Sequence, residues 1–366
     1  MSNAAYSDLK VVWHGDRLAS LRAGEQVVPL QVHFIISDLC NHNCHFCAYR
    51  MDGGFSTEQF ADGLNRNPNR MIPVEKCLEI LDDMAELGVK AVQFTGGGEP
   101  TCHPDHLQIF EHALNLGLEC GLVTNGYILK PGWEVILPRF KWVRVSVDAG
   151  TSETYSRVRG LPQAKKGRTA LARTLGNISL LSDAIERQGS DCLLGLGYVI
   201  TNENFKELPS AVEMLSETGA AYVRLSAMFS DQGSEYYNGN YNEIHKLIQH
   251  AKEYESDDFG VVDLFGERIE DLDLGEPDYP FCAYQQLVCY IGGNQKVYRC
   301  CTTSYTAHGE IGDLTNQRFR VWFKSQAKQA AIDSLDARSC QTCQFNGKNK
   351  TVNYMLDGEP THVNFV

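Results

Sequence analysis

The chain has 366 residues, of which 43% are hydrophobic, and carries a net charge of −13 from 33 basic and 46 acidic side chains. This length suits a large α/β domain with a smaller second one, and the apolar content is enough for a sizeable core. An acidic surface repels polyanions, so nucleic acid is not the expected partner. No apolar stretch is long enough for a signal peptide or a membrane span, which predicts a cytoplasmic protein with no membrane partner.

Residues 1–30 read as an N-terminal extension, after which strand-like and helix-like stretches alternate to residue 228. The helix expected over residues 73–88 has Pro73 in its first turn and Gly88 after its end, the usual asymmetry of helix ends. Further helices are expected at 167–189 and 204–219, and strands at 31–37, 89–95, 119–126, 141–150, 192–200 and 220–228. About six βα units predict a parallel sheet, doubly wound or barrel-like, with ligands at the carboxyl ends of its strands.

The rest of the chain changes in character. Residues 229–280 are rich in Gly, Asn, Tyr and Asp and are expected to be a connector with one helix. Residues 281–366 hold several cysteines and few periodic segments, which indicates a small domain stapled by metal. The chain has 13 cysteines, and in a reducing compartment they are not expected to form disulfides.

The first cysteine group is Cys40, Cys44 and Cys47, in "CNHNCHFC". Structural zinc takes four ligands, usually as two C-x2-C pairs, and no second pair lies nearby. His42 or His45 would be the fourth ligand, but both are immediate neighbours of the cysteines. A [4Fe–4S] cluster on three thiolates would instead leave one iron open for a ligand.

This C-x3-C-x2-C spacing with an aromatic residue before the third cysteine, followed by "GGGEP" after the next strand, resembles the radical S-adenosylmethionine superfamily over residues 31–228. The resemblance implies a partial (βα)6 parallel barrel and a [4Fe–4S] cluster on the three cysteines. It also implies that the free iron chelates S-adenosylmethionine, and that a 5′-deoxyadenosyl radical then abstracts hydrogen from an unactivated C–H.

The resemblance also implies cofactor contacts at matching positions, which are Phe46, Gly97, Gly98, Glu99, Asn125, Ser146 and Asp148. Each has a plainer reading as a turn, a strand cap or a core aromatic. A cation is expected for the methionine carboxylate, and Arg159 and Arg168 are equal candidates. Cys102, just past "GGGEPT", is either a packed thiol or a hydrogen-atom donor to a substrate radical.

The second cysteine group resembles the SPASM/twitch extension of the same superfamily. The resemblance implies the twitch form, with one auxiliary [4Fe–4S] cluster held by Cys282, Cys300, Cys340 and Cys343. Cys301 is an alternative to Cys300. Only one of the two can be the ligand, because adjacent residues of a hairpin face opposite sides. Gln295 stands where the family has glycine, which indicates a turn shifted to Gly292 and Gly293. A zinc-binding C-terminal domain is the alternative.

An auxiliary cluster with four ligands suits an electron conduit, and hence a net oxidation or dehydrogenation. The short N-terminal extension favours a small-molecule substrate of sugar or aminocyclitol type. The alternatives are a peptide-modifying enzyme (oxidation, crosslinking or epimerisation) and a non-catalytic iron–sulfur electron carrier. The expected protein partner is a one-electron reductant such as flavodoxin or ferredoxin.

Overall fold

The computed structural model describes residues 6–50, 70–162, 169–358 and 361–362. Its centre is a ten-stranded sheet in the order β10-β9-β8-β1-β2-β3-β4-β5-β6-β7. The strands are β1 (Gln31–Phe34), β2 (Ala91–Phe94), β3 (Glu119–Thr124), β4 (Trp142–Ser146), β5 (Leu193–Ile200), β6 (Tyr222–Ala227), β7 (Gly260–Leu264), β8 (Val288–Ile291), β9 (Lys296–Tyr298) and β10 (Glu310–Asp313).

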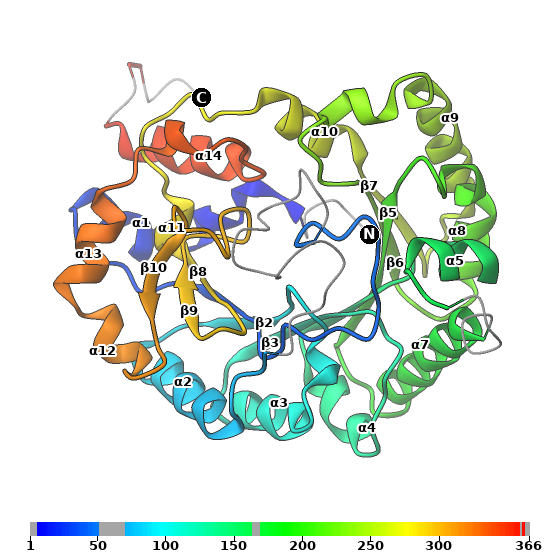
Figure 1. Ribbon diagram of the computed structural model, residues 1–366, viewed down its shortest axis with the longest axis horizontal. Coiled ribbons are helices and arrows are strands. Elements are labelled where there is room, and N and C mark those ends of the chain that lie inside the picture. Colours follow the sequence, from blue (N-terminus) through cyan, green and yellow to red (C-terminus); the bar gives the residue numbers. More distant parts are fainter. Residues whose placement is uncertain (1–5, 51–69, 163–168, 359–360, 363–366) are drawn as a thin grey trace.

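Strands β1 to β7 are parallel and follow one another in sequence order, so the predicted parallel α/β fold is confirmed. Figure 1 shows the helices arranged around the outside of the curved sheet. They are α1 (Gly15–Arg22), α2 (Val74–Leu87), α3 (His106–Asn115), α4 (Trp133–Ile136), α5 (Ser152–Val158), α7 (Ala170–Arg187), α8 (Leu208–Ser216), α9 (Tyr241–Ala251), α10 (Phe265–Leu274), α11 (Tyr284–Leu287), α12 (Phe319–Phe323), α13 (Gln326–Asp333) and α14 (Asn346–Leu356).

Local sequence explains the first of the long helices. Helix α2 begins directly after Pro73 and ends at Gly88, whose φ of 89° is left-handed and therefore suits glycine. Its apolar side, which includes Cys77, Leu81 and Met84, is buried against the outer face of the sheet. In each strand, every second side chain packs outward against the helices. The side chains between them point into the barrel.

The range 229–280, expected as a connector with one helix, contains α9, strand β7 and α10. Strand β7 pairs with β6 along Tyr222–Ser226 and ends the sheet on that side. Its sequence, "GVVDL", is short and lies between polar stretches, so its periodicity was too brief to indicate a strand.

The C-terminal region continues the same sheet, because β8 pairs in parallel with β1. Strands β8 and β9 form the predicted hairpin, and β10 pairs with β9. The expected shift of the hairpin turn is wrong. Gln295 itself takes the left-handed φ of 65° at the position where the family has glycine, and its N–H donates to Gly292 O at 2.8 Å.

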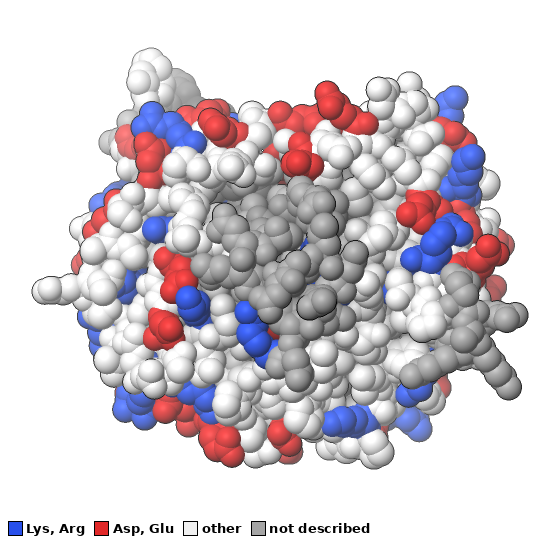
Figure 2. All heavy atoms as spheres, viewed as in Figure 1, with Lys and Arg blue, Asp and Glu red and all other residues white. Residues whose placement is uncertain are grey.

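The N-terminal extension packs on the C-terminal region. Leu21 and Val27 share a small apolar cluster with Leu287 and Val352. In the described part of the chain, no helix has the length and apolar character to cross a membrane. Figure 2 shows acidic and basic side chains interspersed on the face viewed, with no single-sign patch among the described residues seen there.

Candidate active site

The first cysteine group lies on the loop after strand β1, at the carboxyl edge of the sheet. Two guanidinium groups approach its sulfur atoms. Arg50 Nε lies 3.4 Å from Cys47 Sγ, and Arg159 Nη1 lies 3.6 Å from Cys44 Sγ. Burial raises the pKa of the Cys40 and Cys44 thiols, so bound metal would be needed to hold them as thiolates. Three thiols beside two cations fit an anionic, thiolate-bound [4Fe–4S] cluster.

The two histidines of this loop contact other groups. The His42 ring packs against Tyr127 and Tyr155 at centroid distances of 5.7 and 6.1 Å, and His45 Nε2 lies 3.3 Å from Glu203 Oε1. Among the described residues, no three His, Cys, Asp or Glu side chains are arranged to hold one metal ion.

Glu99 ties the loop after β2 to the end of β3. Its Oε1 accepts hydrogen bonds from Thr101 N at 3.1 Å, Thr101 Oγ1 at 2.7 Å and Thr124 Oγ1 at 2.7 Å. Its Oε2 accepts Asn125 N at 2.7 Å, and Asn125 Nδ2 donates to Asn41 Oδ1 at 2.6 Å, inside the cysteine loop. Four of the protein's own donors therefore occupy this carboxylate, which positions Asn125 beside the cysteines.

The glycines before Glu99 allow two loops to touch. A Cβ added to Gly98 would lie 2.4 Å from Asp38 C and 2.5 Å from Leu39 O, a contact that no side chain tolerates. Glu99 N donates to Leu39 O at 2.9 Å across the same junction. The Gly97–Gly98 segment thus lies against the backbone that leads into the cysteine loop.

Asp148, after strand β4, is held in a strained backbone conformation. Its φ of 60° is unusual for a residue with a side chain. Val199 N donates to Asp148 Oδ1 at 2.6 Å, and Asn204 Nδ2 donates to Asp148 O at 2.9 Å. Arg159 Nη2 lies 2.5 Å from Asp148 Oδ2, which completes a buried ion pair. These contacts fix the carboxylate beside the cysteine loop.

Arg159 therefore bridges Asp148 and Cys44. Burial alone would lower its pKa, but these neighbours raise it, so the guanidinium is held charged. Its Nε is buried without a hydrogen-bond partner among the described residues, and Phe46 lies 5.9 Å from the guanidinium carbon. Ser146 is half-buried at the end of β4. Arg168, the other cation predicted from sequence, lies outside the described residues.

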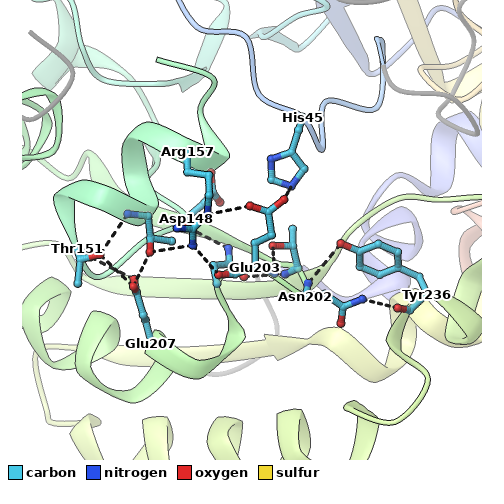
Figure 3. A network of polar contacts seen from close by, with 11 residues as sticks. His45, Asp148, Thr151, Arg157, Asn202, Glu203, Glu207 and Tyr236 are labelled. Atoms are coloured by element: carbon cyan, nitrogen blue, oxygen red, sulfur yellow. Dashed lines mark hydrogen bonds and ion pairs between the residues drawn. The ribbon is translucent and has the colours of Figure 1, made fainter. Parts of the chain in front are cut away.

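A polar network anchors the loop and helix α5 to the turn after β5 (Figure 3). Glu203 lies between His45 and Arg157, whose Nε is 2.9 Å from Glu203 Oε2. Glu207 accepts from Thr151 N at 3.2 Å and Thr151 Oγ1 at 2.9 Å, at the start of α5. Arg159 directly follows α5, so the Glu207 contacts at the start of the helix also hold the segment that carries this guanidinium.

Cys102 ends the 3-10 turn η3 (Pro100–Cys102), next to the cysteine loop. The backbone N–H of Asn41 interacts with its thiol, and burial raises the pKa of Cys102 to about 11. The side chain is half-buried. At neutral pH it is therefore a neutral S–H, the state that a hydrogen-atom donor requires.

The second cysteine group converges although its members are far apart in the chain. One cavity is lined by Cys282, Cys300, Cys340 and Cys343. The same lining includes Arg299 and Tyr279, whose Oη lies 3.6 Å from Cys343 Sγ. Burial raises the pKa of Cys282 and Cys340 to about 12. Four thiols around one cavity, beside a guanidinium, fit a cluster with every iron ligated by protein.

Cys301 and Cys289 lie outside that lining. Cys301 Sγ accepts a hydrogen bond from Gln344 Nε2 at 3.1 Å, and Cys289 is buried in the main core. Adjacent residues at a hairpin end face opposite sides, and here Cys300 is the one that faces the cavity. The placement favours Cys300 over Cys301 as a ligand.

A tyrosine cluster joins the two regions. Tyr305 Oη donates to Asp38, two residues before Cys40, and accepts from Gly293 N at 3.2 Å. Tyr290 Oη donates to Tyr49 Oη at 3.1 Å, two residues after Cys47. The C-terminal hairpin therefore contacts both ends of the first cysteine loop.

Sequence reasoning missed the arginines beside the sulfur atoms, Arg50 and Arg299. Both had a usable signal, because Arg50 follows Cys47 by three residues and Arg299 directly precedes Cys300. A basic residue next to a metal-ligating cysteine balances the charge of the thiolates.

An open parallel barrel with a three-cysteine loop at the carboxyl edge of its first strand defines a class of iron–sulfur enzymes that bind S-adenosylmethionine. The family model described as "Radical SAM superfamily" matches residues 34–215. The chain belongs to the radical SAM superfamily and is an enzyme of that family.

Relatives extend the likeness beyond the barrel. The AdoMet-dependent heme synthase of Methanosarcina barkeri is 26% identical over 84% of this chain and 86% of its own. The PqqA peptide cyclase of Methylorubrum extorquens is 24% identical over 88% of this chain and 80% of its own. The crystal structure of Streptococcus suis SuiB with precursor peptide SuiA has a TM-score of 0.61 at 15% identity, covering 92% of this chain and 75% of that one, which shows a shared fold.

Proposed function

We propose that this enzyme removes a hydrogen atom from an unactivated C–H of a small molecule and completes a net two-electron oxidation, with an auxiliary cluster as electron acceptor. The observation that carries this proposal is the cavity lined by Cys282, Cys300, Cys340 and Cys343. Four protein thiolates leave no vacant iron, so a cluster there suits electron transfer better than substrate ligation.

Cys40, Cys44 and Cys47 would hold the first cluster, and S-adenosylmethionine would bind beside it. When bound, these groups supply a 5′-deoxyadenosyl radical that abstracts hydrogen, and the second cluster supplies a site for the departing electron.

The chain's own residues bind and orient the cofactor. Arg159 presents a charged guanidinium, with its Nε unpartnered among the described residues, to the methionine carboxylate. Asp148 holds that guanidinium in place through the 2.5 Å ion pair. The Gly97–Gly98 segment, which has no side chains beside the cysteine loop, would offer backbone groups to the methionine amino group, and Phe46 would provide an apolar face for the adenine.

The substrate is proposed to be a small molecule of sugar or aminocyclitol type. A peptide substrate is the second candidate, because one relative that aligns with most of this chain is named a peptide cyclase. Redox-neutral epimerisation would give Cys102 a role, since its neutral S–H lies next to the first cysteine loop. The reductant is proposed to be a flavodoxin or a ferredoxin.

Anaerobic reconstitution tests the proposal. The full chain should bind about eight irons, and dithionite should drive cleavage of S-adenosylmethionine to 5′-deoxyadenosine. Deuterium from a labelled substrate should then appear in 5′-deoxyadenosine. Iron content of about four, or zinc in the C-terminal region, would refute the auxiliary cluster. Absence of cofactor cleavage by the fully loaded protein would refute the reaction as a whole.

A further inference from the structure

Two arginines project into the barrel from neighbouring parts of the sheet. Arg144 of β4 is the register partner of Gly195 in β5, and Arg224 of β6 is the register partner of Gly197. Register partners in a parallel sheet share a face, so both arginines lie on the inner face with these glycines. A Cβ at Gly197 would lie 3.8 Å from Arg144 Cδ and 3.9 Å from Arg144 Nε, so the missing side chain leaves room beside the guanidinium.

Neither guanidinium has a hydrogen bond or an ion pair with any described residue, and Arg224 Nε is buried without an acceptor. Their neighbours are aromatic. The Arg144 guanidinium carbon lies 5.7 Å from the Trp142 ring, and that of Arg224 lies 5.8 Å from the Tyr6 ring. Cation–π contacts of this kind compensate a buried charge less than a carboxylate does.

The electrostatic surroundings are cationic. Burial, together with the charges of Arg144 and Arg268, lowers the pKa of Arg224 to about 9. Burial and Arg144 also lower the pKa of His33, on β1, to about 4, so this imidazole is neutral at physiological pH and adds no charge. The Asp148 carboxylate is within electrostatic range of Arg224 but is already paired with Arg159.

Charged groups link this position electrostatically to both cysteine groups. Arg224 acts on Asp148, whose partner Arg159 contacts Cys44. Arg268 interacts electrostatically with Arg224. It also interacts electrostatically with Cys301, the neighbour of Cys300. A ligand held by Arg224 would therefore lie within electrostatic range of Asp148, which is beside the first cysteine loop.

We propose that Arg144 and Arg224 bind a phosphoryl group, so that the substrate is a phosphorylated small molecule anchored inside the barrel. This inference rests on the proposed function and narrows its substrate class. Guanidinium groups match the geometry of phosphate oxygens, and a phosphate dianion balances two unpaired cations, whereas a single carboxylate balances one.

The test is a calorimetric titration of the anaerobically reconstituted full chain with inorganic phosphate, and separately with glutarate. Phosphate is expected to bind at one saturable site, and R144Q and R224Q should each weaken it at least tenfold. The control is R187Q, on the outer helix α7, where Arg187 Nε donates to Asp183 O of its own helix. It should bind phosphate as the wild type does.

Equal phosphate affinity for wild type and R224Q would overturn the inference. Tighter binding of glutarate than of phosphate would also overturn it and would point to a carboxylate, as on an acidic peptide side chain. A second variant, Arg224→Met, shows whether lost binding is due to misfolding. It removes a cation that has no acceptor among the described residues, so the variant should stay folded. Its melting temperature without anion should equal or exceed that of the wild type, and phosphate should raise only the wild-type value.

The titration requires no radical chemistry, so the two proposals fail separately. Cleavage of S-adenosylmethionine without phosphate binding refutes the anion site alone. Phosphate binding by a protein that does not cleave S-adenosylmethionine refutes the proposed reaction and leaves the anion site standing.

Discussion

The two cysteine groups differ in how the chain brings their thiols together. The first places three thiols on one loop, residues 40–47, with arginines on two of the sulfur atoms. The second gathers four thiols from three separate segments around one cavity. A [4Fe–4S] cluster on the first group would leave one iron open for a ligand, and the proposed cluster on the second group would have all its irons bound by thiolates. The proposed open site is therefore built from one loop and supported by neighbouring strand ends, whereas the proposed closed site depends on segments that only the tertiary fold brings together.

The largest expected effect separates the two groups by cysteine substitution. Cys44→Ala removes one of only three thiolates and should abolish formation of 5′-deoxyadenosine. Cys343→Ala should lower the iron content by about four atoms while leaving part of the cofactor cleavage. Both are measured by iron analysis and chromatography of the products. Turnover of S-adenosylmethionine by the Cys44→Ala protein would contradict the assignment of the open site.

The next effect concerns the thiol beside the first group. With its pKa raised to about 11, Cys102 should be alkylated by iodoacetamide about a hundredfold more slowly at pH 8 than an exposed cysteine. Because the folded pKa is raised, the rate should climb as pH rises towards 11. Peptide mass spectrometry across pH 7–11 measures this, with a free cysteine peptide as the reference. Equal rates at pH 8 would show that Cys102 is a thiolate.

The third prediction tests whether Arg159 binds S-adenosylmethionine beside the first cysteine group. Arg159→Gln should weaken binding of S-adenosylmethionine by roughly 10- to 100-fold, the usual value of a charged hydrogen bond. The matched control is Arg157→Gln, on the same helix, where the side chain pairs with Glu203. Equilibrium dialysis with labelled cofactor gives both dissociation constants. Equal weakening in the two variants would point to general damage to helix α5.

The contact between the two regions is tested at Gly293. A Cβ there would lie 2.6 Å from an Asp38 carboxylate oxygen, so Gly293→Ala should lower the free energy of unfolding by about 1–3 kcal/mol. Gly176→Ala is the control, since nothing lies within 4 Å of a Cβ in the middle of helix α7. It should raise stability by about 0.5–1 kcal/mol. Urea titrations measure both, and a neutral Gly293→Ala would mean that the regions do not meet as described.

The smallest expected effect is a change in stability at Gln295, in the turn between β8 and β9. Gln295 has a left-handed φ of 65°, so Gln295→Gly should stabilise the protein by about 1 kcal/mol. Thermal unfolding of the metal-free protein measures the change. Destabilisation would show that the Gln295 side chain has a role that its backbone conformation does not reveal.

Local patterns predicted most of the parallel sheet and the composition of the first cysteine group. Helix α2 was predictable because Pro73 and Gly88 mark its ends, and the cysteine loop because its three cysteines are neighbours in sequence. Strand β7 was not, because five residues carry too short a pattern. The choice between Cys300 and Cys301 also required the fold, since either residue fits the spacing and only the folded chain shows that Cys300 lines the cavity.

The inner face of the barrel was the least predictable part. Arg144 and Arg224 lie in ordinary alternating strands, where a polar residue normally faces solvent. Only the closure of the sheet turns that face inward, where neither guanidinium has an acceptor among the described residues. Glu99 is a similar case, because its four hydrogen bonds come from Thr101 on its own loop and from Thr124 and Asn125 at the end of β3, which meet only in the folded chain.

The parallel pairing of β8 with β1 has a consequence for engineering. Leu30 N and Ile35 N donate to Leu287 O and Ile291 O, so the segment leading into the first cysteine loop is stitched along its length to the C-terminal region. If the region from about residue 281 onwards were exchanged between related enzymes, β1 would pair with a β8 from another protein. Strand β1 leads into the first cysteine loop, so this loop could lose its support. Any crossover between β1 and β8 would have this effect, so chimeras of this family should take both strands from the same parent.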